Sequence, residues 1–190
     1  MYKSASLFVA VVFLAPCLVA AQTDATHRST ASEESATIFE LFLDQWLGKA
    51  GHVNLSYVTE FPDDDALHGY AECLKGEKLA IPSKPQIEEL RGTALEKRKD
   101  VGLVEPTTWR VHDPGESISK GVAVSKAVDE GMKGGLLSLS TLIFDEQHKV
   151  AVLSYSFVCG SLCGSGGTVI FDKKPSGWKA RKERCGGWVS

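Results

Sequence analysis

The part of the sequence that most constrains the fold is the alternation of β-rich runs and turn-forming residues after residue 135. Clusters of Gly, Pro, Asp, Lys and Ser separate these runs, which is typical of an antiparallel meander. The predicted strands are Leu137–Phe144, Val150–Val158, Thr168–Phe171 and Trp178–Glu183. The predicted connections are the turn Asp145–Lys149, the loop Cys159–Gly167 and the turn Lys173–Gly177. This stretch therefore predicts a four-stranded sheet.

The second run shows which face of that sheet is the more apolar. Within Val150–Val158, successive side chains point to opposite faces, and the heavier apolar face carries Ala151, Leu153, Tyr155 and Phe157. The other face carries Val152, Ser154, Ser156 and Val158. This alternation favours a sheet that is covered on one side.

A helix near the start of the chain can supply the cover. Ser35 is a suitable N-cap for a helix over Ala36–Leu47, and Gly48 is placed to end it. One broad stripe of this helix is apolar: Ile38, Phe39, Leu41, Phe42 and Trp46. We expect the stripe to lie on the sheet. The result is a single α+β domain over residues 35–190, for which a cone-like arrangement is one expectation, after a disordered leader over residues 22–34.

The middle of the chain contains weaker signals. They predict a strand over His52–Phe61 and a short helix over Ala66–Leu74. Ser83 followed by Pro85 is typical of a second helix start. A short strand is possible around Trp109–Val111, and residues 115–135, which are rich in Gly and have no steady apolar period, are predicted to form mainly a loop.

Residues 1–21 have the features of a secretory signal peptide. Lys3 is followed by the apolar run Leu7–Leu14 and then by small residues before the expected cleavage site. A retained N-terminal anchor is the alternative. Lipidation of Cys17 is disfavoured because Pro16 precedes it. No later stretch has the length of a transmembrane helix, so we expect a secreted or periplasmic protein.

The charge balance limits the partners. The chain has 21 Lys and Arg against 24 Asp and Glu, a formal net charge of −3, and loss of Lys3 with the signal peptide makes it one unit more negative. A weakly acidic chain of this kind argues against nucleic acid or an anionic membrane as the main partner.

The cysteines predict disulfides. Without Cys17 an even number remains: Cys73, Cys159, Cys163 and Cys185. In an exported chain such a set favours disulfides over free thiols or a metal site. Pairing Cys159 with Cys163 across the mouth of one hairpin leaves Cys73 with Cys185. The alternative pairs Cys159 with Cys185 and Cys73 with Cys163.

The candidate chemistry is sparse. Cys159 and Cys163 could form a redox-active pair, although the usual motif has two intervening residues and a group that lowers the thiol pKa. The glycines of the same loop do not have the spacing of a nucleotide-binding loop. We expect no metal, no cofactor and no catalytic residues. The candidate ligand-binding residues are aromatic: Trp178, Trp188, Tyr155 and Phe157.

The C-terminal residues resemble a known group of sequences. The run Cys159-Gly160-Ser161-Leu162-Cys163-Gly164, followed by Trp178-Lys179 and Gly187-Trp188-Val189-Ser190, is similar to the end of an uncharacterised family of small exported bacterial proteins with a Cys-Gly-x-Leu-Cys-Gly hairpin loop. The resemblance implies export and a bacterial source, but no activity. Cys73 and Cys185 fall outside that motif, which supports a self-contained Cys159–Cys163 pair.

The function expected from these observations is non-enzymatic binding of a small ligand or an envelope protein outside the cytoplasm. Two alternatives stay open. One is a thiol/disulfide redox protein that uses Cys159 and Cys163. The other is a purely structural interaction module.

Overall fold

The computed structural model describes residues 22–48, 51–74, 76–183 and 185–190. The predicted signal peptide, with Cys17, lies outside these residues. Residues 34–190 form one compact unit, and the contacts described below belong to it. Within the described ranges, no helix is both long and apolar enough to cross a bilayer.

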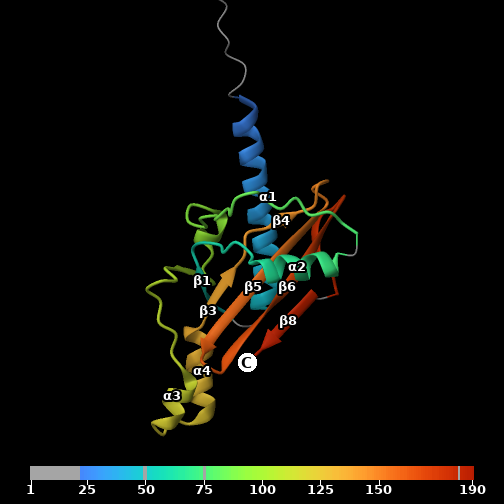
Figure 1. The fold of residues 1–190 in the computed structure, drawn as a ribbon. Coiled ribbons are helices and arrows are strands. Elements are labelled where there is room, and N and C mark those ends of the chain that lie inside the picture. Colours follow the sequence, from blue (N-terminus) through green and yellow to red (C-terminus); the bar gives the residue numbers. More distant parts are fainter. Residues whose placement is uncertain (1–21, 49–50, 75, 184) are drawn as a thin grey trace, which may run out of the picture. The chain divides into compact units, whose positions relative to one another are not determined.

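The centre of the unit is a mixed sheet of eight strands (Figure 1). They are β1 (Val53–Ser56), β2 (Val101–Val104), β3 (Leu136–Leu139), β4 (Ile143–Phe144), β5 (Val150–Gly160), β6 (Cys163–Lys174), β7 (Gly177–Ala180) and β8 (Cys185–Val189). The main order is β2-β1-β3-β5-β6-β7, with β4 on β5 and β8 on β6. β1 is parallel to β2 and β3, and the other pairs are antiparallel.

This sheet confirms the predicted α+β class, but the predicted four-stranded meander is wrong. The first half of the chain adds β1 and β2, and the residues after the predicted last strand form β8. The loop expected at Cys159–Gly167 is also wrong, because β6 begins at Cys163 and only Ser161 and Leu162 separate it from β5. The glycines of that run are therefore strand residues.

The helices among the described residues are α1 (Gln22–Leu47), α2 (Asp64–Cys73), α3 (Pro114–Ser119) and α4 (Val124–Gly134), together with the short 3-10 helix η1 (Ala94–Lys97). α2 confirms the predicted short helix, and the Asp63 side chain caps it by accepting from the Ala66 N–H at 2.8 Å. α1 begins at Gln22, so residues 22–34 are helical and Ser35 is not its N-cap.

Two predictions for the middle of the chain are wrong. Where a helix was expected from Ser83, only η1 forms, because Leu90 and Leu95 are buried as separate anchors and Gly92 between them has a φ of +75°. Where mainly a loop was expected, α3 and α4 form. The buried face of α4 consists of Ala127 and Gly131, which are too small to produce an apolar period.

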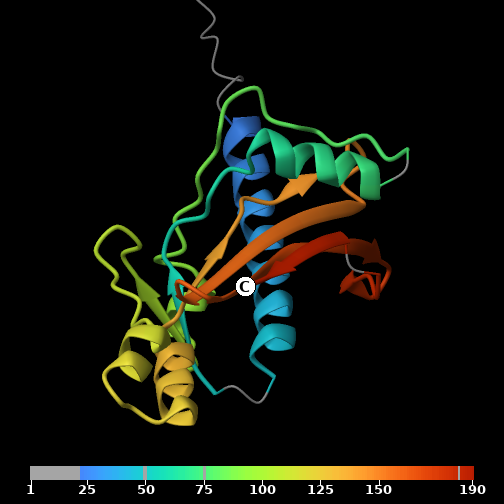
Figure 2. The ribbon, with the colours of Figure 1, turned by 60° about the horizontal axis from the view of Figure 1, so that its bottom comes forward.

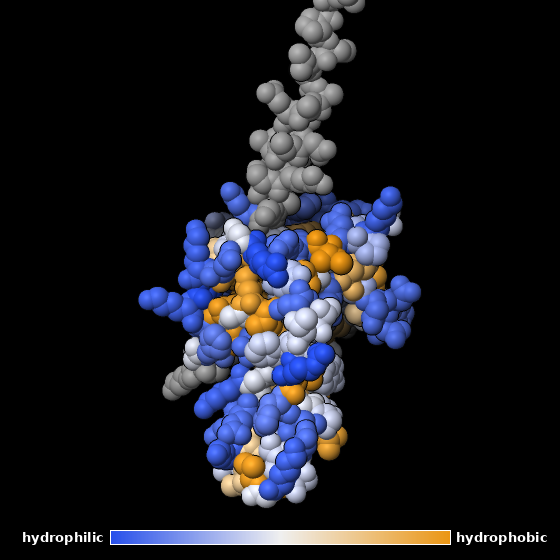
Figure 3. Space-filling view, turned by 90° about the vertical axis from the view of Figure 1, so that its left-hand side faces the viewer, coloured by the Kyte–Doolittle hydropathy of each residue, from blue (hydrophilic) through white to orange (hydrophobic). Residues whose placement is uncertain are grey.

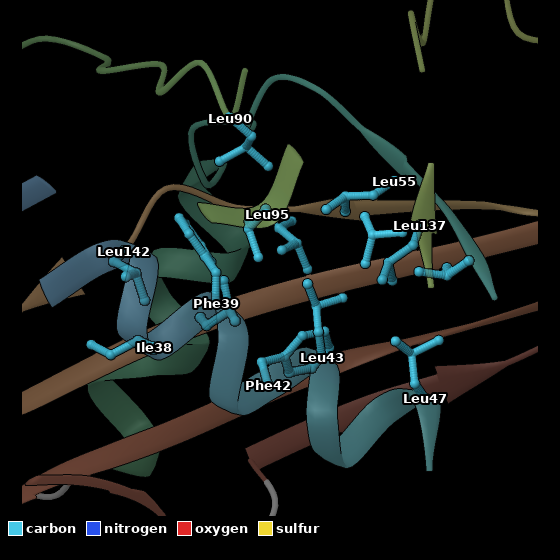
Figure 4. Packing of buried hydrophobic residues seen from close by; sticks show 14 of the residues in the cluster. Ile38, Phe39, Phe42, Leu43, Leu47, Leu55, Leu90, Leu95, Leu137 and Leu142 are labelled. Carbon is cyan, nitrogen blue, oxygen red and sulfur yellow. The ribbon is translucent and has the colours of Figure 1, made fainter. Parts of the chain in front are cut away.

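The apolar stripe of α1 packs against one face of the sheet, as predicted. Figure 4 shows Phe39, Phe42 and Leu43 of α1 directed toward Leu95 and Leu137. Ala151, Leu153 and Phe157 of β5 belong to the same buried cluster, which confirms the expected alternation along this strand.

The opposite face of the sheet is covered as well, so the expectation of a cover on one side is wrong. Tyr70 of α2 and Leu74, which directly follows the helix, form a second buried cluster with Val150, Val152 and Ile170. Figures 1 and 2 show α2 and the C-terminal half of α1 on opposite sides of the strands. The Tyr70 hydroxyl donates to Ser154 Oγ at 2.6 Å, and burial raises the pKa of Tyr70.

Two disulfides confirm the favoured pairing. Cys73–Cys185 joins the end of α2 to β8, with the Cα atoms 5.8 Å apart. Cys159–Cys163 spans the tip of the β5–β6 hairpin, with the Cα atoms 5.0 Å apart.

Asn54 links β1 to the end of α4. Its amide nitrogen donates to the carbonyl oxygens of Lys133 at 2.9 Å and Gly135 at 3.0 Å, and only 9% of the residue is exposed. Asn54-Leu55-Ser56 matches a glycosylation acceptor sequence, but all three residues are buried in β1.

Glu88 connects the segment before η1 to α1, and the link depends on pH. Ser35 Oγ donates to Glu88 Oε1 at 3.4 Å, and the Glu88 N–H donates to Thr59 Oγ1 at 2.9 Å. Burial raises the pKa of the Glu88 carboxyl, and the Ser35 hydrogen bond opposes this rise. A carboxyl whose pKa is higher in the folded state contributes stability below its unfolded pKa and loses that contribution as pH rises through the folded pKa.

We therefore expect Glu88→Gln, which is neutral at every pH, to raise the melting temperature at pH 7. The difference from the unmodified chain should shrink as the pH falls below the unfolded pKa of Glu. Thermal unfolding at a series of pH values measures this, with Glu89→Gln as the exposed control. A Gln variant that is less stable at pH 7 would contradict the expectation.

Candidate functional site

A cleft lies between the C-terminal half of α1 and the edge of the sheet formed by β8. Its volume is about 730 Å³. We call it the aromatic cleft. The residues that define it below are Phe42, Trp46 and Tyr155 on one side, Ser165, Gly167 and Val169 of β6 along the floor, and Gly186, Gly187 and Val189 along the edge.

The aromatic side of the cleft is a packed group of rings. The centroid of Tyr155 lies 5.1 Å from that of Phe42 and 4.9 Å from that of Trp46, and Phe42 and Trp46 are 6.0 Å apart. Behind them, Phe157 lies 5.7 Å from Trp46. Phe42 is buried, whereas Trp46 and Tyr155 are partly exposed. The group therefore presents ring surface to the cleft and is held in place from behind.

The floor and far edge are open because glycines replace side chains there. Tyr155 of β5 pairs with Gly167 of β6, which pairs with Gly187 of β8. A Cβ atom on Gly167 would lie 3.4 Å from the Gly186 carbonyl oxygen and 3.5 Å from Tyr155 Cε1. Gly186 and Gly187 have φ angles of +69° and +156°, so β8 turns sharply here. The backbone therefore faces the cleft at this end.

The charged residues of the cleft lie at its rim. Arg181 donates to Asp172 Oδ1 from Nε at 3.0 Å and from Nη2 at 2.8 Å, and to Glu77 Oε1 at 2.9 Å. The Arg181 hydrogen bonds lower the pKa of Asp172. Lys182 and Glu183, next in sequence, are exposed. Since Arg181 is already paired, the rim carries little unbalanced charge.

The four candidate binding residues do not form one site. Tyr155 lines the aromatic cleft, and Trp188 lies at its edge. The strand register places their side chains on opposite faces of the sheet, because Tyr155 is opposite Gly167 whereas Trp188 is opposite Gly166. Phe157 and Trp178 are 6% and 7% exposed.

Trp178 belongs to the core beneath the β4–β5 turn. Its ring lies 5.9 Å from that of Phe144, and Lys173 Nζ is 5.5 Å above it. Trp178 Nε1 is buried and has no hydrogen-bond partner among the described residues. Trp178 is therefore packed in the core and exposes no surface that a ligand could contact.

Sequence reasoning missed Phe42 and Trp46 as cleft residues. Both were assigned to the apolar stripe of α1, and Phe42 does bury itself there. Trp46 packs against the same buried cluster but is only partly buried, so part of its ring faces the cleft. The available signal was the unusual breadth of the stripe.

The Cys159–Cys163 disulfide has surroundings that favour a structural role. Cys159 is 1% exposed, and its Sγ lies 3.7 Å from Met132 Sδ. Between the cysteines, the Ser161 N–H donates to Asp113 Oδ2 at 3.0 Å. Hydrogen bonding from the Ser161 side chain, and then from its N–H, lowers the pKa of Asp113 and keeps a carboxylate at the hairpin tip. A nearby negative charge disfavours a thiolate, which a redox cysteine requires.

One serine and one histidine lie within hydrogen-bond distance. Ser117 Oγ is 2.7 Å from His112 Nε2, and Glu130 Oε2 is 3.9 Å from the same ring nitrogen. In a catalytic triad the acid and the nucleophile use different ring nitrogens, and Ser117 is only 7% exposed. This group therefore lacks triad geometry. No three His, Cys, Asp or Glu side chains of the described ranges gather as a metal site would require.

Comparisons with protein-family models, curated proteins and solved structures find no match to the chain.

Proposed function

We propose that this protein is an exported, non-enzymatic domain that binds a small amphipathic ligand in the aromatic cleft. The observation that carries the proposal is the combination of exposed ring surface at Trp46 and Tyr155 with a floor and edge that glycines leave open. Sites for small molecules are typically concave and lined by aromatic groups with a few polar groups around them.

The chemistry of the lining narrows the ligand class. The rings offer an apolar surface for stacking, with edges and faces both available. Polar groups surround it at Gln45, Ser165 and Thr168, with the exposed Lys182 and Glu183 at the rim. We infer a ligand with one flat apolar part and a polar periphery, small enough for a cleft of about 730 Å³.

Export rests on the N-terminal sequence, on the family resemblance and on the disulfides. Cysteines paired as Cys73–Cys185 and Cys159–Cys163 are compatible with an oxidising compartment. The redox alternative is less well supported, because Cys159 is buried and Asp113 lies at the hairpin tip.

The cleft can be tested with anilinonaphthalene sulfonate, a flat aromatic probe with a polar group. We expect saturable binding to the native protein, with energy transfer from tryptophan to the probe. Trp46→Ala should weaken binding by about tenfold, because loss of a buried aromatic contact is worth ~1–2 kcal/mol. Fluorescence titration gives the dissociation constants.

Trp109→Ala is the matched control, since it removes a tryptophan whose Nε1 donates to the Gly134 carbonyl oxygen and which lies outside the cleft. It should bind the probe as the unmodified chain does. Equal affinity for the Trp46 and Trp109 variants, with both folded by circular dichroism, would refute binding in the aromatic cleft.

A further inference from the structure

The face of the sheet that α2 covers carries a second row of groups suited to a ligand. Ser138 of β3 is opposite Ser156 of β5, Ser156 is opposite Gly166 of β6, and Gly166 is opposite Trp188 of β8. Directly opposed residues point to the same face. The row across these four strands therefore consists of two hydroxyls, a position without a side chain and an indole. From the first strand to the fourth it spans about 14 Å at the usual strand spacing.

The polar groups of this row have no partners within the described part of the chain. The Ser138 and Ser156 hydroxyls make no hydrogen bond there, and neither does Trp188 Nε1, whereas the neighbouring Ser154 hydroxyl is bonded to Tyr70 and Thr168. Ser138 and Ser156 are partly exposed. Both hydroxyls are therefore available to a ligand.

Trp188 is held in place although it is 46% exposed. A Cβ atom on Gly166 would lie 2.3 Å from Trp188 Nε1, and one on Gly164 would lie 3.1 Å from its Cη2 and Cζ3 atoms. The long axis of the indole thus runs along β6, over two successive glycines of one face. Any larger residue at Gly164 or Gly166 would displace the ring, so these two glycines leave the space that the indole occupies.

The residues of this row line two adjoining grooves. One, of about 190 Å³, is lined by Ser138, Ser156 and Ala66, and the other, of about 470 Å³, by Trp188, Thr168 and Ala66. The two grooves share Ala66, Ser154 and Tyr155, and Ala66 belongs to α2, which overhangs both. We call the combined feature the serine groove.

The described residues bring charges of only one sign to the serine groove. Their charged side chains are Glu60 and Asp63 on one side and Glu72 on the other, and no described Lys, Arg or His lines it. Acidic groups at the rim repel anions, and the hydroxyl floor contributes no charge. The groove therefore disfavours an anionic ligand, and its hydroxyls suit a ligand that both donates and accepts hydrogen bonds.

We propose that the serine groove is a binding site for a neutral oligosaccharide. A sugar ring has an apolar C–H face that can stack on the exposed indole, and hydroxyls that can pair with Ser138, Ser156 and the rim carboxylates. A row of about 14 Å suits a short chain of sugar units better than a single one. Tyr155 and Trp188 line both the serine groove and the aromatic cleft, whereas Trp46 and Phe42 line the cleft alone.

The test is binding of the full folded domain to a printed array of neutral and anionic glycans, followed by calorimetric titration of the glycans that it retains. We expect retention of at least one neutral glycan. Trp188→Ala should weaken its binding at least about tenfold through loss of stacking. Ser156→Ala should weaken it by about two- to tenfold through loss of one hydrogen bond.

Trp46→Ala is the control, because Trp46 lines the aromatic cleft and is not one of the residues that line the serine groove. It should retain the same glycan with unchanged affinity, and failure of the cleft proposal would leave this result unaffected. If Trp188→Ala proves poorly folded, Ser156→Val supplies the test, since it fills the groove floor with a residue that strands favour. Retention of no neutral glycan, or binding unchanged in folded Trp188→Ala and Ser156→Val, would overturn the proposal.

Discussion

Replacing Cys73 and Cys185 together by alanine is expected to lower the free energy of unfolding by about 4–5 kcal/mol. The disulfide closes a loop with a sequence separation of 112 residues, and the entropy that such a cross-link removes from the unfolded chain grows with loop length. The bond also holds β8 to α2, next to the buried cluster that includes Cys185. Urea denaturation of the oxidised protein and of the double variant measures the difference.

The second disulfide supplies the matched control. Cys159 and Cys163 have a sequence separation of only 4, and the same relation gives about 2 kcal/mol for such a short loop. Replacing that pair by alanine should therefore cost less than half as much. A larger loss for the Cys159 and Cys163 variant would show that strain or local packing, and not loop entropy, determines the contribution of each bond.

Asn54→Asp is expected to destabilise the protein by about 3 kcal/mol at pH 7. The amide of Asn54 donates to two carbonyl oxygens, those of Lys133 and Gly135. A carboxylate at this position has no proton to donate and would place a negative charge against both acceptors, which costs desolvation as well as the two hydrogen bonds.

The pH dependence identifies the cause. Because the charged form is disfavoured in the fold, the pKa of the new carboxyl should be higher in the folded state than in the unfolded state. Stability relative to the unmodified chain should therefore recover as pH falls through that value. Gln147→Glu, the same amide-to-acid change in an exposed turn, is the control and should change stability little. A deficit for Asn54→Asp that does not shrink in acid would contradict the role given to the amide.

Regular patterns in the sequence predicted those parts of the fold that depend on one large apolar face. The alternation in β5 and the stripe in α1 both place large side chains at a fixed period, and burial of those side chains decides the structure. The same reasoning failed for α4, whose buried face consists of Ala127 and Gly131, while Val124, Val128 and Met132 are exposed. On the face of the molecule drawn in Figure 3, the exposed apolar side chains form small patches among hydrophilic ones.

The sequence did not predict which residues that are distant along the chain pair with one another. The parallel pairing of β1 with β2 and β3 leaves no local pattern, because each strand is only four residues long. The candidate sites show the same limit. Tyr155 and Trp188 could be proposed as binding residues from their type, but their separation onto opposite faces follows from the register of three strands.

The topology of the sheet also sets an order of assembly. Val53 of β1 pairs with Val101, and Leu55 pairs with Leu137. The parallel pairs of the sheet therefore form only when residues far apart in the sequence come together, which requires closure of long loops. The β5–β6 hairpin needs only a turn of two residues and can form early. Until β1 is inserted, β3 presents an open edge to other chains. We therefore expect the insertion of β1 to be a late step of folding, with the β3 edge open to self-association until then.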